Sequence, residues 1–121
     1  MINELVMVLI GGSLGAVGRF ALTGWINERT KGSFPIATFL INLSGSFLLG
    51  ALLSFQTGHL VYLLLGTGFL GGFTTFSTFQ MESIALLRLN QRNTMLLYFC
   101  LTFSSCILLA FFGIYFGSLI Q

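Results

Sequence analysis

The chain has 121 residues, of which 55% are hydrophobic and only 7% are charged, and its formal net charge is +2. A soluble domain carries about a quarter charged residues, so the composition excludes an ordinary soluble domain and favours a membrane protein. The few charges are scattered, which argues against a nucleic-acid partner.

Four apolar stretches are predicted to cross the membrane, at about 5–26, 35–55, 60–87 and 95–119. Each is close to the ~20 residues that span ~30 Å of hydrocarbon. The opening MINELV has no Lys or Arg, so we expect the first stretch to be retained rather than removed as a signal peptide. The short connectors predict one four-helix membrane domain over 1–121. Four helices enclose little interior, so we expect a polar site to need a second chain.

The Lys and Arg residues outside the spans fall on one side of the predicted bundle. Loops one and three carry Arg29, Lys31, Arg88 and Arg92, whereas the termini and loop two carry none. The positive-inside rule therefore favours loops one and three in the cytoplasm. Arg19 lies within the first span, nearer the basic side, and its long side chain can reach the interface.

Small residues recur at helical spacing in three spans. They are Gly11, Gly15 and Gly18, then Asn42, Ser46 and Gly50, then Gly113 and Gly117. Such stripes allow helices to approach closely in lipid, and we expect this packing role for the glycines. Asn42 lies mid-span, where an unpaired amide is costly, so it either bonds across helices or faces an ion path.

The third span contains the run GGFTTFSTF at 71–79, which is rich in glycine, hydroxyls and rings. As one straight helix the span would be about 42 Å long, longer than the hydrocarbon is thick. Glycine weakens a helix by about 1 kcal/mol relative to alanine, so we expect a break near 71–75, with Gly71 to Thr74 unwound. Backbone freed at this depth must be buried in protein or line a cavity, and its carbonyls suit a cation such as sodium.

Aromatic and hydroxyl residues in the last two spans suggest an anion path. Phe76 and Phe79 are three residues apart and share a helix face, where their electropositive ring edges can approach an anion. Packing in the core or against lipid is the alternative for these rings. Tyr98, Thr102 and Ser105 share a face of the fourth span, where their hydroxyls either face an anion or bond back to their own helix.

Three motifs make the chain resemble the small fluoride channels called Fluc or CrcB. They are GGSLGAVGRF at 11–20, TFLINLSGSFLLG at 38–50 and GTGFLGGFTTFSTF at 66–79, and the resemblance covers nearly the whole chain. It implies an all-α membrane protein of four helices, with the third helix broken, that forms an antiparallel, dual-topology dimer. Each of the two fluoride pores would be lined by both subunits. The implied role is passive fluoride efflux across the plasma membrane of a prokaryotic cell, which gives fluoride resistance.

The resemblance also implies roles for individual residues. The implied pore residues are Asn42, Phe76, Phe79, Ser77, Tyr98 and Thr102. The carbonyls of Gly71 and Thr74 match those that hold a structural sodium ion, which is not transported, on the dimer axis. Arg19 and Glu82 match vestibule positions. The next step of the fourth-span track is Cys106, where a hydroxyl is expected, so either Ser105 continues the track or the track is shorter.

The uneven distribution of basic residues between the loops bears on the partner chain. Four basic residues lie in the loops on one side and none on the other, which fits poorly with a chain that inserts in both orientations. The partner is therefore either a second copy or an oppositely oriented paralogous subunit.

A small multidrug exporter needs a carboxylate within the first span, whereas Glu4 lies at its edge. A non-conducting structural subunit would leave the hydroxyl and aromatic run unexplained. We expect no enzyme, because His59, Cys100 and Cys106 lack companions for a metal or catalytic site.

Overall fold

The computed structural model describes residues 1–121, and all of its regular structure is helical. The elements are α1 (Ile2–Arg29), α2 (Ile36–Ser54), α3 (His59–Tyr62), the π-helix η1 (Leu63–Leu70), α4 (Gly71–Phe73), α5 (Ser77–Arg88) and α6 (Arg92–Leu119). Four segments are long and apolar enough to cross a membrane, namely α1, α2, His59–Arg88 and α6. The predicted all-α class with four spans is therefore confirmed, and every observed bound lies within one helical turn of the predicted one.

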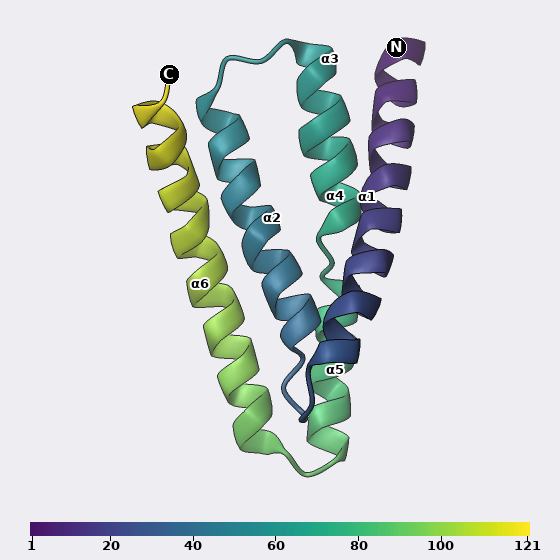
Figure 1. Cartoon of the computed structure of the whole chain (residues 1–121), viewed down its shortest axis with the longest axis vertical. Helices are drawn as coiled ribbons and strands as arrows, with labels where there is room; N and C mark the ends of the chain where they lie inside the picture. Colours follow the sequence, from purple (N-terminus) through teal and green to yellow (C-terminus); the bar gives the residue numbers. More distant parts are fainter.

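The spans run alternately up and down, as Figure 1 shows. Both termini and the α2–α3 connection lie at one end of the molecule, and the α1–α2 and α5–α6 connections lie at the other. The basic residues Arg29, Lys31, Arg88 and Arg92 belong to or flank the second pair of connections. One end of the bundle is thus basic, as the sequence predicted.

Close backbone contacts join the helices in two pairs, α2 with α6 and α1 with the third span. At Gly113 of α6, a Cβ atom would collide with Phe47 O and lie 2.9 Å from Ala51 N, both in α2. At Gly15 of α1, a Cβ atom would collide with Phe69 O. These glycines have the packing role that their spacing predicted, because a larger residue would force the helices apart.

The third span is a bent segment that departs from α-helical geometry in two places. Leu63–Leu70 is π-helical, a feature that the sequence analysis did not predict and that often occurs at functional sites. Thr74 has extended dihedral angles, φ −79° and ψ 159°, and the helix resumes with α5 at Ser77. We expected Gly71 to Thr74 to be unwound, but Gly71–Phe73 is helical and the non-helical residues are 74–76. Side chains bond to the backbone of this segment, as described below.

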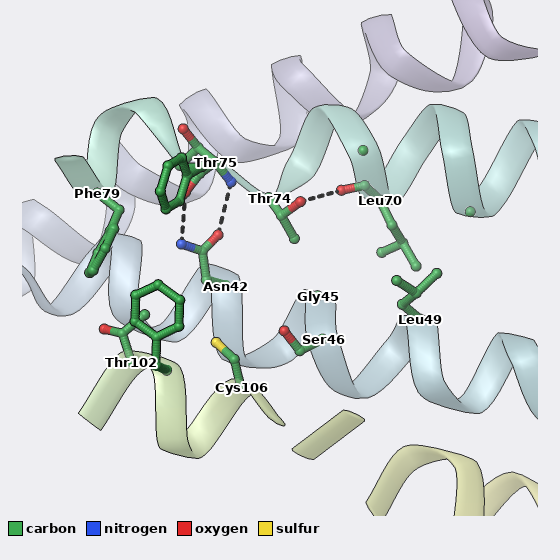
Figure 2. A pocket seen from close by; sticks show the side chains of 14 residues that line it. Asn42, Gly45, Ser46, Leu49, Leu70, Thr74, Thr75, Phe79, Thr102 and Cys106 are labelled. Carbon is green, nitrogen blue, oxygen red and sulfur yellow. Dashed lines mark hydrogen bonds between the residues drawn. The ribbon is translucent and has the colours of Figure 1, made fainter. Parts of the chain in front are cut away.

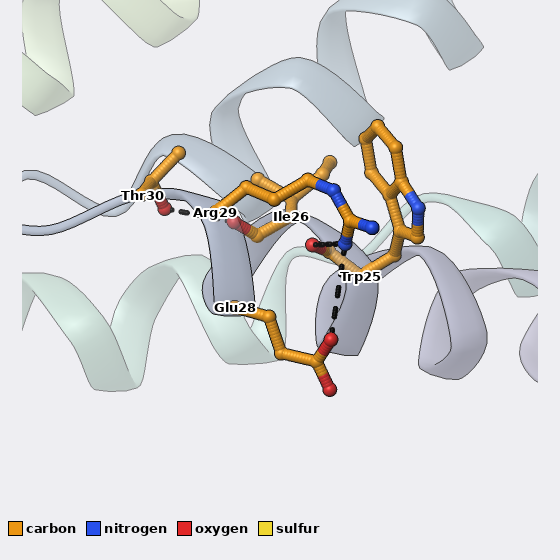
Figure 3. A network of polar contacts seen from close by, with 5 residues as sticks. All are labelled: Trp25, Ile26, Glu28, Arg29 and Thr30. Atoms are coloured by element: carbon orange, nitrogen blue, oxygen red, sulfur yellow. Dashed lines mark hydrogen bonds and ion pairs between the residues drawn. The ribbon is translucent and has the colours of Figure 1, made fainter.

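The C-terminal end of α1 combines a cation with an aromatic ring (Figure 3). The Arg29 guanidinium carbon lies 4.1 Å from the centroid of the Trp25 ring, and Nη1 donates to Trp25 O at 3.0 Å. The same Nη1 lies 3.8 Å from Glu28 Oε2, and Thr30 Oγ1 donates to Ile26 O at 3.0 Å. The Thr30 bond satisfies the carbonyl of Ile26, which lies in the last turn, where carbonyls lack intrahelical partners. Trp and Arg are also typical anchors at the boundary between membrane and water.

Candidate functional site

A cavity of about 330 Å³ lies between the third span, α2 and α6 (Figure 2). Its lining residues are Asn42, Gly45, Ser46, Leu49, Gly66, Leu70, Gly71, Thr74, Thr75, Phe76, Phe79, Thr102, Phe103 and Cys106. No charged side chain is among them. The wall therefore offers an amide, hydroxyls, a thiol and ring edges, which are neutral groups that can contact a small ion.

The cavity brings together part of the site predicted from the sequence. The predicted residues that line it are Asn42, Gly71, Thr74, Phe76, Phe79 and Thr102. The predicted residues that lie outside its lining are Arg19, Ser77, Glu82, Tyr98 and Ser105. The second and third motifs thus meet in space, together with one face of α6.

Asn42 is bonded to the backbone of the non-helical segment. Its Nδ2 donates to Thr75 O at 2.9 Å, and its Oδ1 accepts the Thr75 N–H at 2.9 Å, as the dashed lines in Figure 2 show. Asn42 is only 9% exposed, so the amide that would be costly to bury is paired. The bond across helices that the sequence analysis considered for Asn42 is present, and the same side chain lines the cavity.

Threonine hydroxyls organise the rest of this segment. Thr74 Oγ1 donates to Leu70 O at 2.8 Å, at the end of the helical part. Thr75 Oγ1 accepts the Thr78 N–H at 3.2 Å and lies 3.1 Å from Thr78 Oγ1, to which it donates. Accepting the N–H three residues ahead is what a capping hydroxyl does, and Thr75 does so from the position just before Phe76, the N-cap residue of α5.

The two predicted pore rings have different surroundings. Phe79 is 2% exposed, and its ring centroid lies 5.0 Å from Tyr98, 5.6 Å from Phe99 and 5.7 Å from Phe103. Phe76 is 60% exposed in the single chain, and its ring contacts Phe79 with a centroid separation of 5.9 Å. The Phe79 ring is thus held by its neighbours, whereas the Phe76 ring projects from the cavity wall.

The α6 side of the cavity is formed by Thr102, Phe103 and Cys106. Thr102 is 7% exposed, and its Oγ1 has no hydrogen-bond partner in the chain. Cys106 lines the cavity and Ser105 does not. One turn earlier, Tyr98 donates its hydroxyl to Glu82 Oε1 at 3.0 Å, outside the cavity. Cys106, and not Ser105, is thus the α6 residue that lies on the cavity wall one turn after Thr102.

Arg19 bonds to the third span from the other side. Its Nε donates to Gly72 O at 3.1 Å. Arg19 also lines a second cavity of about 180 Å³, together with Thr38, Thr75 and Thr78. Thr75 lines both cavities, so the non-helical segment lies between them.

Thr75 and Phe103 are among the lining residues that are not predicted as site residues from the sequence. Thr75 carried a usable signal, because threonine is one of the residues favoured at helix starts. Phe103 carried none, since it is one of 14 phenylalanines in the chain.

Comparison with known proteins identifies the family. A protein-family model described as "CrcB-like protein, Camphor Resistance (CrcB)" matches residues 6–114. The chain belongs to the CrcB-like family. This CrcB-like chain is therefore a multi-pass membrane protein and not an enzyme, and the family predicted from its motifs is confirmed.

Relatives of this CrcB-like chain match it over most of its length. A "Fluoride-specific ion channel FluC 2" of Bacillus cereus is 49% identical over 116 residues, which cover 96% of this chain and 98% of that protein. A "Fluoride-specific ion channel FluC 1" of Listeria innocua is 43% identical over 117 residues, covering 97% and 99%. A FluC 1 of Carboxydothermus hydrogenoformans is 54% identical over 84 residues, covering 69% and 68%.

Proposed function

We propose that this chain forms a fluoride-selective channel that gives passive efflux from the cytoplasm and so confers fluoride resistance. The observation that carries the proposal is a cavity lined mostly by residues of the second and third motifs and free of charged side chains, in a chain whose relatives are named fluoride-specific ion channels. The bacterial plasma membrane is the site of action that this role requires.

The lining of the cavity suits a small, strongly hydrated anion. Such an ion enters only where protein groups replace its lost water, and the unpartnered Thr102 hydroxyl can donate to it. The exposed Phe76 ring offers its electropositive edge. Because no Lys or Arg lines the cavity, binding stays weak enough for the ion to leave, as conduction requires.

A second chain completes the proposed pore. Phe76 is 60% exposed in the single chain although it lies on the cavity wall, so a further surface is needed to enclose an ion beside it. We infer an antiparallel dimer, formed either with a second copy or with an oppositely oriented paralogous subunit. The basic residues gathered at one end of the bundle favour a fixed orientation and hence the second arrangement.

The proposed structural sodium ion fits the donors that this chain supplies. The carbonyls of Gly71 and Thr74 belong to residues on the cavity wall. The amides that would bond to them in a continuous helix donate elsewhere, to Asn42 Oδ1 and Thr75 Oγ1. Carbonyl oxygens are hard ligands suited to an alkali cation, and the same two carbonyls from a partner would complete the set.

Expression in a bacterial strain that lacks its own fluoride channel tests the proposed function. Expressed alone or together with an oppositely oriented paralogous subunit, the chain should restore growth on fluoride, and cells should hold less fluoride at equal external concentration. Failure to restore growth while the chain is present in the membrane would contradict the function for the chain alone. Co-expression with a paralogous subunit would then decide between a fixed heterodimer and a wrong function.

A further inference from the structure

The Gly71 and Thr74 carbonyls lack helical partners for an identifiable reason. In an α-helix, each carbonyl accepts the N–H of the residue four positions later, which would be Thr75 for Gly71 and Thr78 for Thr74. The Thr75 N–H donates instead to Asn42 Oδ1 at 2.9 Å, and the Thr78 N–H donates to Thr75 Oγ1 at 3.2 Å. Two side-chain oxygens thus draw both donors away.

Two neighbouring carbonyls are occupied by side chains. Asn42 Nδ2 donates to Thr75 O at 2.9 Å, and Arg19 Nε donates to Gly72 O at 3.1 Å. Side chains of α1 and α2 therefore bind the carbonyls of Gly72 and Thr75 and leave those of Gly71, Phe73 and Thr74. Of these three residues, Gly71 and Thr74 line the cavity and Phe73 does not.

We propose that Asn42 and the Thr75 hydroxyl are positioning residues that create the cation site, by preventing the Gly71 and Thr74 carbonyls from forming their helical bonds. The inference rests on the proposed function and assigns Asn42 a task beyond lining the pore. Without these two oxygens, the Thr75 and Thr78 amides would return to the Gly71 and Thr74 carbonyls, and the helix would close over the site. A hard monovalent cation, with sodium as the probe, is the ligand that this pair of carbonyls suits.

Sodium-dependent stability of the purified protein tests the inference without using transport. A ligand that binds only the folded state raises the melting temperature with its concentration, so the melting temperature is measured against sodium with choline as the replacement ion. Asn42→Leu and Thr75→Val remove the two oxygens at similar side-chain size. Thr75→Ser keeps the hydroxyl, and Ser46→Ala changes another cavity residue of α2 that forms no bond to the segment.

The expected result is that Asn42→Leu and Thr75→Val need roughly tenfold more sodium than the native chain for the same rise, a change within the range that the loss of one or two hydrogen bonds produces. Thr75→Ser and Ser46→Ala should stay within about twofold. Native sodium dependence in Asn42→Leu and Thr75→Val would overturn the inference. Absence of any sodium effect in the native protein would overturn both the inference and the sodium site. Fluoride flux from the same preparation tests the channel function separately.

A measurement on the native chain keeps the inference testable if the variants do not fold. With ¹³C-labelled carbonyls, sodium should shift the resonances of Gly71 and Thr74 and leave that of Gly72, which Arg19 occupies, in place. An equal shift at all three carbonyls, or a shift at Gly72 alone, would contradict the proposed division between free and occupied carbonyls.

Discussion

Replacing Phe76 with isoleucine should separate conduction from stability. Phe76 is 60% exposed and has one ring neighbour, Phe79 at 5.9 Å, so Phe76→Ile should change the free energy of unfolding by less than about 1 kcal/mol. Phe79 is 2% exposed and also contacts Tyr98, Phe99 and Phe103, so Phe79→Ile should cost about 2–4 kcal/mol. Loss of the Phe76 ring edge should nevertheless slow fluoride flux at least ~10-fold, which corresponds to about 1.4 kcal/mol.

The assay is fluoride efflux from vesicles, recorded with a fluoride electrode at equal amounts of reconstituted protein. Phe111→Ile is the matched control, because Phe111 is 69% exposed and does not line the cavity. The control should conduct like the native chain. Native flux in Phe76→Ile would refute the reasoning that its ring edge contacts the anion.

Two further substitutions test the packing and the cavity wall. Gly113→Ala should destabilise the protein by about 1–3 kcal/mol in thermal unfolding, because the added Cβ meets the α2 backbone. Gly24→Ala is the control and should not destabilise it, because no atom lies within 4 Å of the added Cβ. Equal effects of the two substitutions would contradict the close approach of α2 and α6. A charged methanethiosulfonate reagent should block fluoride flux through the native chain and through Cys100→Ser, and should fail on Cys106→Ser, because Cys106 lines the cavity and Cys100 does not. Block that persists in Cys106→Ser would place this thiol outside the path.

Local sequence patterns were enough to predict the spans and many of the cavity residues. Span length and hydropathy depend on composition within one stretch of chain, so the four spans could be located within a turn. The motif positions Asn42 and Phe79 do meet at one cavity with Thr102 of the fourth span. The choice between Ser105 and Cys106 depended on how α6 is rotated. Around the helix axis, Ser105 is turned by about −60° from Thr102 and Cys106 by about +40°. The cavity lies on the side of Cys106.

Contacts between distant segments could not be predicted in this way. The extent of the non-helical segment is set by Asn42, 33 residues before Thr75 in the chain, and no local pattern specifies which backbone an amide will bind. Glycine content suggested that Gly71 would unwind, yet Gly71 keeps helical angles, φ −63° and ψ −38°. Glycine permits a departure from the helix, but here the side-chain acceptors for the Thr75 and Thr78 amides determine where it occurs.

The most direct test of the central claim is anion flux through the purified chain in vesicles, with fluoride compared with chloride at equal gradients. The chain should release fluoride and retain chloride, because neutral donors and ring edges in a cavity of about 330 Å³ replace the water of a small anion. Adding a paralogous subunit to the same vesicles would show whether the chain needs a different partner. Equal rates for fluoride and chloride would contradict the account of selectivity, and no flux of either ion with or without the partner would contradict the channel itself.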